Sequence, residues 1–354
     1  MPPTLRSAIR RNLLRWYKIN KRDLPWRRTR DPYAVWISET MLQQTQVNTV
    51  IPYYEKFMGR FPCVDELARA PLSKVLRLWS GLGYYRRAEN LRKAAQQIVR
   101  LHAGEIPRDF AQLRALAGIG DYTAGALLSI AFGKSYPAID GNARRVLSRV
   151  LRITNDRAVR AAAQELVSGS KPGDFNQALM DFGATICTPK NQRCADCPIN
   201  SLCASRLRPD APPMLGSRRP LKFKSVVWPL VIVRRAGKIL LRRRDARGVL
   251  AGLWELPGEE LNGKQAIAAL FERELKGVRQ SFRPPEKLGE IRHAITHRRI
   301  RAPVYLLNLA ANSRVNLPKP GWRWIAPAKL QELATSSMTV KALAIFSSHE
   351  KNLR

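Results

Sequence analysis

Apolar residues recur at helical spacing through most of the first two hundred positions of this 354-residue chain. From Leu5 to Tyr17, for example, apolar residues return every three or four positions, with arginines between them. Such a period indicates a helix with one buried face. Seven segments are predicted as helices on this pattern, at 5–17, 33–46, 86–101, 109–117, 124–132, 143–151 and 172–186.

The pattern changes after residue 225. The run VVWPLVIVRRAGKILLRRR predicts two strands around an Ala-Gly turn, and 265–276 predicts a helix. Before it, at 206–224, prolines and arginines replace periodic structure, which predicts a linker. We therefore expect an all-α domain at 1–205 and an α+β domain at 225–354.

The net charge of the chain indicates which class of molecule it binds. The chain carries 62 Lys and Arg against 27 Asp and Glu, a formal net charge of +35. The cations are clustered: residues 1–30 hold ten of them against the single acid Asp23. A basic excess of this size indicates a polyanionic partner, DNA or RNA, although a generally basic proteome is the alternative. No apolar run reaches membrane-spanning length and arginines interrupt the start, so we expect a cytoplasmic, nucleoid-associated bacterial protein without membrane association, and a monomer.

Four of the five cysteines are grouped. Cys187, Cys194, Cys197 and Cys203 lie within seventeen residues, whereas Cys63 stands alone. In a cytosolic chain this grouping favours a metal site over disulfides. Four thiolates suit either a tetrahedral zinc ion or a cubane cluster, and spacing alone does not separate the two.

A glycine-framed turn separates two of the predicted helices. Gly118, Ile119 and Gly120 carry little side-chain bulk, so backbone N–H groups can point outward beside the N-terminus of the next helix. Such a turn can bind phosphate. Most glycine turns between helices only connect them, which is the alternative.

Two carboxylates are candidates for chemistry. Glu39 is the only acid in an apolar and amide-rich helix, so we expect it in a desolvated cleft with a raised pKa. Asp140 opens the predicted helix at 143–151, where an ordinary N-cap is the alternative. An acid on a leaving group and a carboxylate against a sugar are what cleavage of a glycosidic bond requires.

Several motifs together resemble one family. The runs LPW, SETMLQQTQV, GLGYY and LAGIGDY, the aspartate twenty residues beyond the hairpin, and the cysteine spacing are similar to those of the MutY-type adenine DNA glycosylases. These belong to the helix-hairpin-helix superfamily of endonuclease III. The resemblance covers residues 5–330 and implies an all-α helix-hairpin-helix glycosylase domain with an iron-sulfur loop, followed by a Nudix-like α+β domain.

The resemblance also implies a reaction. The expected enzyme removes adenine mispaired with 8-oxoguanine or guanine in double-stranded DNA, with Glu39 protonating the adenine and Asp140 stabilising the sugar cation. Tyr122 stands where endonuclease III has the lysine that forms a Schiff base, so hydrolysis without strand cleavage is expected. Tyr122 is expected to hydrogen-bond near the aspartate, and Asn142 to orient the aspartate or a water.

The remaining site residues are carried over from the same family. Trp26 and Arg27 are expected to line the adenine pocket with Leu42, and Gln177 to lie near the adenine. Gln44 and Tyr84 occupy positions at which the family inserts side chains into the base stack. The four grouped cysteines are expected to hold a structural, DNA-orienting 4Fe-4S cluster.

This chain departs from the family pattern at a few positions. Ala117 stands where the hairpin usually has proline. In the second domain Gly277 and Val278 replace metal-binding acids, which argues against pyrophosphate hydrolysis. The run that reads 8-oxoguanine corresponds to Ile295, Thr296 and His297, with isoleucine in place of an aromatic residue.

Two other functions stay open on the sequence alone. A bifunctional pyrimidine glycosylase with lyase activity would share the hairpin and the cysteines, but Tyr122 and the second domain argue against it. A non-enzymatic iron-sulfur DNA-binding protein would keep the hairpin and the cysteines without needing Glu39 and Asp140 together.

Overall fold

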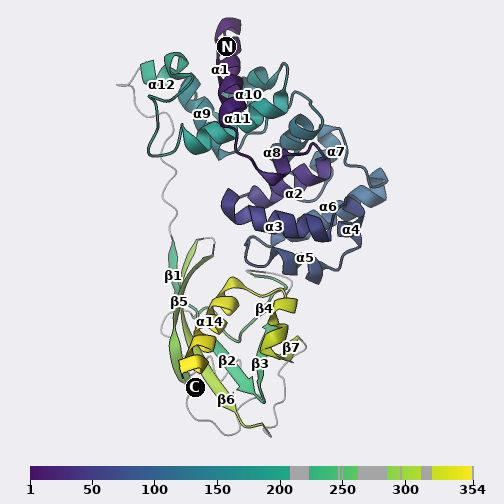
Figure 1. Cartoon of the computed structure of the whole chain (residues 1–354), viewed down its shortest axis with the longest axis vertical. Coiled ribbons are helices and arrows are strands. Elements are labelled where there is room, and N and C mark those ends of the chain that lie inside the picture. The colour runs from purple at the N-terminus through teal and green to yellow at the C-terminus, as the bar shows by residue number, and fades with distance from the viewer. Residues whose placement is uncertain are drawn as a thin grey trace. The chain divides into compact units, whose positions relative to one another are not determined.

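Helices alone build the N-terminal part of the chain (Figure 1). The computed structural model describes residues 1–207, 223–245, 248, 250–261, 285–295, 297–311 and 321–352. Contacts divide it into two units, one of residues 1–70 and 86–218, the other of 71–85 and 219–354. The helical elements up to residue 207 are α1 (Pro3–Asn20), η1 (Pro25–Arg27), α2 (Pro32–Leu42), α3 (Val47–Arg60), α4 (Val64–Arg69), α5 (Leu72–Trp79), α6 (Arg86–His102), α7 (Phe110–Ala115), α8 (Asp121–Ala126), η2 (Leu127–Ala131), α9 (Gly141–Leu151), α10 (Asp156–Val167), α11 (Pro172–Thr185), η3 (Asn200–Leu202) and α12 (Ala204–Leu207).

Helix α2 is enclosed by the first unit. Every residue from Tyr33 to Met41 is buried, as expected of a helix without a polar face. Asp31 caps its start, accepting hydrogen bonds from the backbone N–H groups of Tyr33 and Ala34 at 3.1 and 3.2 Å. Any polar side chain on this helix is therefore held away from bulk water.

The helix predicted at 33–46 is shorter in the structure. It ends at Leu42, and Gln44 adopts a left-handed backbone with φ 59°. Arg87 of α6 supplies the reason, because its guanidinium donates to the carbonyls of Met41 at 2.8 Å and of Gln43 at 2.5 Å. These bonds satisfy the carbonyl groups that a helix leaves unpaired at its C-terminus.

One hydrophobic core of the first unit brings the first helix together with helices from the end of the helical part. Helices α1, α9, α10 and α11 contribute its buried residues, and Cys187, Cys197 and Cys203 pack against it. The cysteine loop therefore lies against the group of helices that includes α9.

Apart from residues 71–85, which contain α5, the described part of the second unit is a sheet with one α-helix against it. Its described strands are β1 (Lys224–Val227), β2 (Leu230–Arg235), β3 (Lys238–Arg243), β4 (Trp254–Glu255), β5 (Glu286–Ile295), β6 (Arg298–Leu309) and β7 (Trp322–Ile325). The strand order is β1-β6-β2-β3-β4, with β5 paired to β6 and β7 to β3. The turn η5 (Pro327–Glu332) precedes α14 (Ser337–Asn352), whose Met338, Ala342 and Phe346 share the core of the sheet.

The predicted turn between β2 and β3 is present. Ala236 and Gly237 both have positive φ, 46° and 72°, as the tight turns of antiparallel hairpins require. The helix predicted at 265–276, residues Gly277 and Val278, and most of the predicted linker lie outside the described residues. Among the described helices, none is long and apolar enough to cross a bilayer.

Candidate active site

Glu39 lies on the enclosed helix α2 and is only 5% exposed. Burial raises its pKa from 4.5 to about 7. A hydrogen bond from the Tyr122 hydroxyl and the positive charge of Arg27 lower that pKa in part, whereas the charge of Asp140 raises it. The expectation of a desolvated glutamate with a raised pKa is confirmed, and this carboxyl can carry a proton near neutral pH.

Tyr122 stands in the first turn of α8 and donates from its hydroxyl to Oε2 of Glu39. Its oxygen also lies 3.6 Å from Sδ of Met180. The sequence analysis expected a hydrogen bond near the aspartate: the acceptor is Glu39, and Asp140 is close enough to raise the pKa of Tyr122. Burial and the nearby carboxylates raise the pKa of Tyr122 well above 10.0, so its hydroxyl stays protonated and remains a donor.

Asp140 is the N-cap of α9 and an electrostatic neighbour of Glu39. Its Oδ1 accepts from the backbone N–H of Ala143 at 2.7 Å, and its Oδ2 from Nδ2 of Asn142 at 2.9 Å. Burial raises the pKa of Asp140, and these two hydrogen bonds oppose the rise. Asn142 thus contacts the aspartate as an orienting residue would, and the N-cap interpretation of Asp140 is correct.

Arg27 is fixed by a residue that the sequence analysis missed. Its guanidinium donates to both carboxylate oxygens of Asp181, at 2.6 and 3.0 Å, and lies 5.6 Å from the ring centre of Tyr17. The Asp181 side chain is 1% exposed and also accepts from Nε of Arg22 at 2.9 Å. The signal was available, because Asp181 is an isolated carboxylate in the apolar run ALMDFGATI, as Glu39 is in its own run.

The other expected substrate residues differ in exposure. Trp26 is buried, with its ring centre 5.3 Å from that of Tyr54, and Leu42 is half-buried at the end of α2. Gln177 is half-buried on α11, one turn before Met180. The two residues expected to enter the base stack, Gln44 and Tyr84, are both exposed and both have positive φ, 59° and 48°.

The hairpin turn is held against α6. Ile119 N–H bonds to the Leu116 carbonyl at 3.2 Å, and Gly118 has φ +75°, which fits a type II turn. A Cβ atom at Gly118 would lie 2.7 Å from Cβ of Asn90, so a larger residue is excluded. Among the described backbone groups, the N–H groups of Gly118 and Gly120 are left for an anion.

Ala117 replaces the usual proline without leaving its N–H unpaired. That N–H donates to Oε1 of Gln97 on α6 at 2.8 Å. The departure from the family pattern is thus matched by an extra hydrogen bond between the hairpin and α6.

The four grouped thiols are neighbours. Burial, followed by the influence of the other three thiols, raises the pKa of Cys197 to about 11, although a backbone hydrogen bond lowers it in part. Arg149 of α9 donates to Sγ of Cys187 at 3.4 Å, and Arg145 donates to the Cys187 carbonyl at 2.9 Å. Four soft donors beside two arginines suit an anionic iron-sulfur centre. Within the described residues, however, no three Cys, His, Asp or Glu side chains converge closely enough to hold a metal ion.

The run expected to read 8-oxoguanine lies at the turn between β5 and β6. Thr296 lies outside the described residues. His297 is exposed, and its carbonyl accepts from the N–H of Lys224 at 2.8 Å. Ile295 is half-buried and packs against the core of the sheet, where an aromatic residue stands in the family pattern.

Comparisons with known proteins show the family to which the chain belongs. Residues 37–170 match the family model described as "HhH-GPD superfamily base excision DNA repair protein", and residues 229–344 match the NUDIX domain. The chain is 36% identical to the adenine DNA glycosylase of Rattus norvegicus over 98% of this chain and 79% of that protein, and equally identical to the Homo sapiens protein over 97% and 75%. A thermostable thymine-DNA glycosylase of known structure is similar over 58% of this chain and 98% of its own, with 32% identity and a TM-score of 0.55.

Proposed function

Since the chain belongs to the adenine DNA glycosylase family, we propose that it hydrolyses the N-glycosidic bond of adenine mispaired with 8-oxoguanine or guanine. It is a DNA N-glycosylase of base excision repair. The observation that carries the proposal is the pairing of buried Glu39, with a pKa of about 7, and half-buried Asp140, which is close enough to raise that pKa.

Glu39 acts as the general acid. With a pKa of about 7, a large fraction of its carboxyl carries a proton at neutral pH, which a carboxyl with the ordinary value of 4.5 would have lost. The proton goes to the imidazole side of the adenine ring, so that the base leaves as a neutral molecule. Tyr122 keeps the carboxyl in one orientation and stabilises the carboxylate that remains.

Asp140 stabilises the sugar. Departure of the base leaves an oxocarbenium-like deoxyribose, and a fixed carboxylate nearby lowers the energy of that cation. The N–H of Ala143 and the amide of Asn142 both donate to Asp140, so they favour its charged form and hold its direction.

The reaction is hydrolysis without strand cleavage. A phenol cannot form the Schiff base through which a lysine at position 122 would lead to lyase chemistry. Water completes the reaction at the sugar carbon, and the product is an abasic site in an unbroken strand.

Arg27 and Asp181 help to form the pocket for the flipped base. The two hydrogen bonds from Arg27 to Asp181 hold the planar guanidinium in place, and its positive charge lowers the pKa of Glu39. Trp26 lies next to it in sequence within η1, so one short turn supplies both residues to the adenine pocket. Gln177, on the same helix as Asp181, adds an amide to that side of the pocket.

The grouped cysteines would hold a 4Fe-4S cluster. Cys187, Cys194, Cys197 and Cys203 would be its ligands, and the cluster would cross-link the loop for which Arg149 and Arg145 already provide hydrogen bonds. Iron and sulfide analysis of purified protein, with visible absorbance, tests this assignment. Four iron and four sulfide ions per chain are expected, and a single zinc ion would contradict it.

The second unit recognises the base opposite adenine. Its support is the position of His297 at the turn of a strongly basic hairpin. Substituting His297 by alanine should lower the preference for 8-oxoguanine over guanine and leave the rate on the guanine mispair close to that of the intact protein.

The function is tested with four duplexes that differ only in the base opposite adenine: 8-oxoguanine, guanine, thymine and cytosine. Single-turnover release of adenine is expected with the first two and not with adenine opposite thymine. Borohydride trapping together with strand cleavage would instead support a bifunctional lyase. Tight binding with no release from any duplex would support a non-enzymatic binding protein.

A further inference from the structure

Three arginines project from one face of the β5–β6 hairpin. Arg292 of β5 is directly opposite Arg301 of β6, and Ala294 is opposite Arg299. Side chains alternate between the two faces of a sheet, so Arg292, Arg299 and Arg301 share a face. All three are exposed, whereas Ile291 and Ile300, on the other face, belong to the core.

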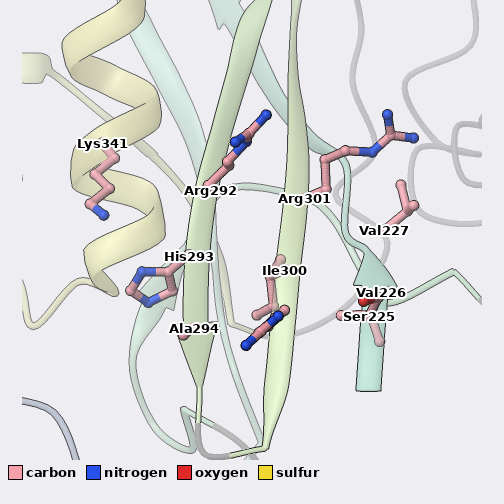
Figure 2. Close-up of a pocket in the computed structure, with 10 residues that line it drawn as sticks. Ser225, Val226, Val227, Arg292, His293, Ala294, Ile300, Arg301 and Lys341 are labelled. Atoms are coloured by element: carbon pink, nitrogen blue, oxygen red, sulfur yellow. The ribbon is translucent and has the colours of Figure 1, made fainter. Parts of the chain in front are cut away.

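A pocket of about 660 Å³ lies at these strands. Ser225 and Val227 of β1 line it beside the arginines, because β1 pairs with β6 through the same residues. Figure 2 shows Arg292 and Arg301 on neighbouring strands, with His293 turned toward the helix that carries Lys341. None of the residues lining the pocket is acidic.

The positive charge of this face is largely uncompensated by the fold. Like charges directly opposite on neighbouring strands repel each other. Among the described residues, the acid that forms an ion pair with one of these arginines is Glu290, whose Oε2 lies 3.8 Å from Nε of Arg301. Arg299 lies over the ring of Phe223 at 4.7 Å, which holds its guanidinium on the same face without neutralising it. An arrangement that repels itself suits a surface on which an anion provides the missing charge.

We propose that this face, made by Arg292, Arg299 and Arg301, binds the phosphate backbone of the duplex next to the mispair. The inference rests on the proposed function, which sets the hairpin turn at Ile295–His297 against the base opposite adenine. Arg292 precedes that turn by three residues and Arg299 follows it by two, so the two surfaces are continuous on one hairpin. Phosphate contacts fix the register of a protein on DNA, whereas contacts to base edges identify the sequence. The arginine face is therefore a positioning surface for the residues at the turn.

The occupant is DNA rather than a small anion because of the spacing. Arg299 and Arg301 are two residues apart on one strand, which separates their backbones by about 7 Å. Arg292 extends the same face across to the neighbouring strand. Guanidinium groups distributed in this way can each contact a different phosphate of one polyanion.

The test uses the full chain with Arg292, Arg299 and Arg301 all changed to glutamine. Affinity for a duplex with adenine opposite 8-oxoguanine is measured from 50 to 200 mM salt. Each lost phosphate contact lowers the slope of log K against log salt by about 0.9, so three contacts lower it by about 2.7. The advantage of the intact protein over the variant should then shrink about 40-fold across that salt range. At saturating protein, the preference for 8-oxoguanine over guanine should fall, because the residues at the turn lose the surface that positions them.

A charge-matched control separates this face from a general loss of charge. Lys238, Lys329 and Lys351 are exposed elsewhere in the same unit, and changing all three to glutamine should leave the slope nearly unaltered. An equal change of slope in both triple variants would overturn the proposal, as would an unchanged slope in the arginine variant. Because Arg292→Gln removes one of two opposed charges, its melting temperature should not fall, and a clear fall would show that the arginines serve the fold instead.

The two hypotheses fail in different ways. If the intact protein releases no adenine from either mispair, the proposed function fails whatever the salt dependence. If adenine is released normally and the arginine variant keeps the full salt slope, only the arginine face is wrong.

Discussion

Replacing Glu39 by glutamine should stop base release and, above neutral pH, make the protein more stable. Burial raises the pKa of this carboxyl from 4.5 to about 7 in the folded state. A carboxyl with a raised pKa contributes stability below pH 4.5, and that contribution is lost as the pH rises through about 7. Above that pH the fold holds a buried negative charge, which the neutral amide avoids.

The magnitude follows from the difference in pKa. At 1.36 kcal/mol per pH unit, the rise from 4.5 to about 7 corresponds to about 3 kcal/mol. One kcal/mol moves the melting temperature of a unit of this size by about 2–4 °C, so an increase of about 6–12 °C is the upper bound. The amide oxygen can still accept from the Tyr122 hydroxyl, so this hydrogen bond is kept in the variant.

The assay is calorimetric melting of the intact protein and of Glu39→Gln at pH 5, 6, 7 and 8. The variant's gain in melting temperature should be small at pH 5 and grow with pH until it levels off above pH 7. Glu66→Gln, which removes an exposed carboxylate of the same unit, is the matched control and should show no such trend. Equal melting temperatures at pH 8, or a less stable variant there, would refute the reasoning about Glu39.

Three further substitutions test other parts of the account. Asn142→Ala removes a hydrogen-bond donor that lowers the pKa of Asp140. Single-turnover release of adenine should fall about 10- to 100-fold, and the loss of activity at low pH should begin at a higher pH than in the intact protein. An unshifted pH profile would count against this role of Asn142. Gln97→Ala should destabilise the hairpin by about 1 kcal/mol in the native chain, because it removes the acceptor of the Ala117 N–H. The same substitution should have no further effect in Ala117→Pro, since proline has no N–H to donate. Additive changes in melting temperature would contradict this hydrogen bond. Asp181→Asn leaves two arginines without their shared carboxylate and should destabilise the first unit by about 3–5 kcal/mol, so a variant that melts like the intact protein would exclude the buried network.

Local patterns predicted the parts of the fold that local interactions determine. Ala236 and Gly237 form the expected turn because both must adopt positive φ and the flanking apolar runs pair in register. The desolvation of Glu39 followed from an apolar helix with a single acid. These features depend on neighbours within a few residues, so the sequence carries them directly.

Long-range contacts determined what the sequence did not reveal. Helix α2 stops at Leu42 because Arg87, over forty residues away, takes its last carbonyls. The sequence did not reveal that Tyr122 donates to Glu39, since the packing of α8 against α2 decides which carboxylate accepts this hydrogen bond. The apolar run around Asp181 marked this residue, but it did not reveal the arginines that pair with it, because they lie more than 150 residues earlier in the chain.

The central claim is that Glu39 and Asp140 divide the cleavage of the glycosidic bond between them. Single-turnover release of adenine opposite 8-oxoguanine tests it most directly, with the intact protein compared with Glu39→Gln and with Asp140→Asn under matched iron loading. The account predicts that both variants bind the duplex as the intact protein does and release adenine at least a hundredfold more slowly, about 3 kcal/mol of transition-state stabilisation each. Release at the intact rate by either variant would contradict the two-carboxylate mechanism.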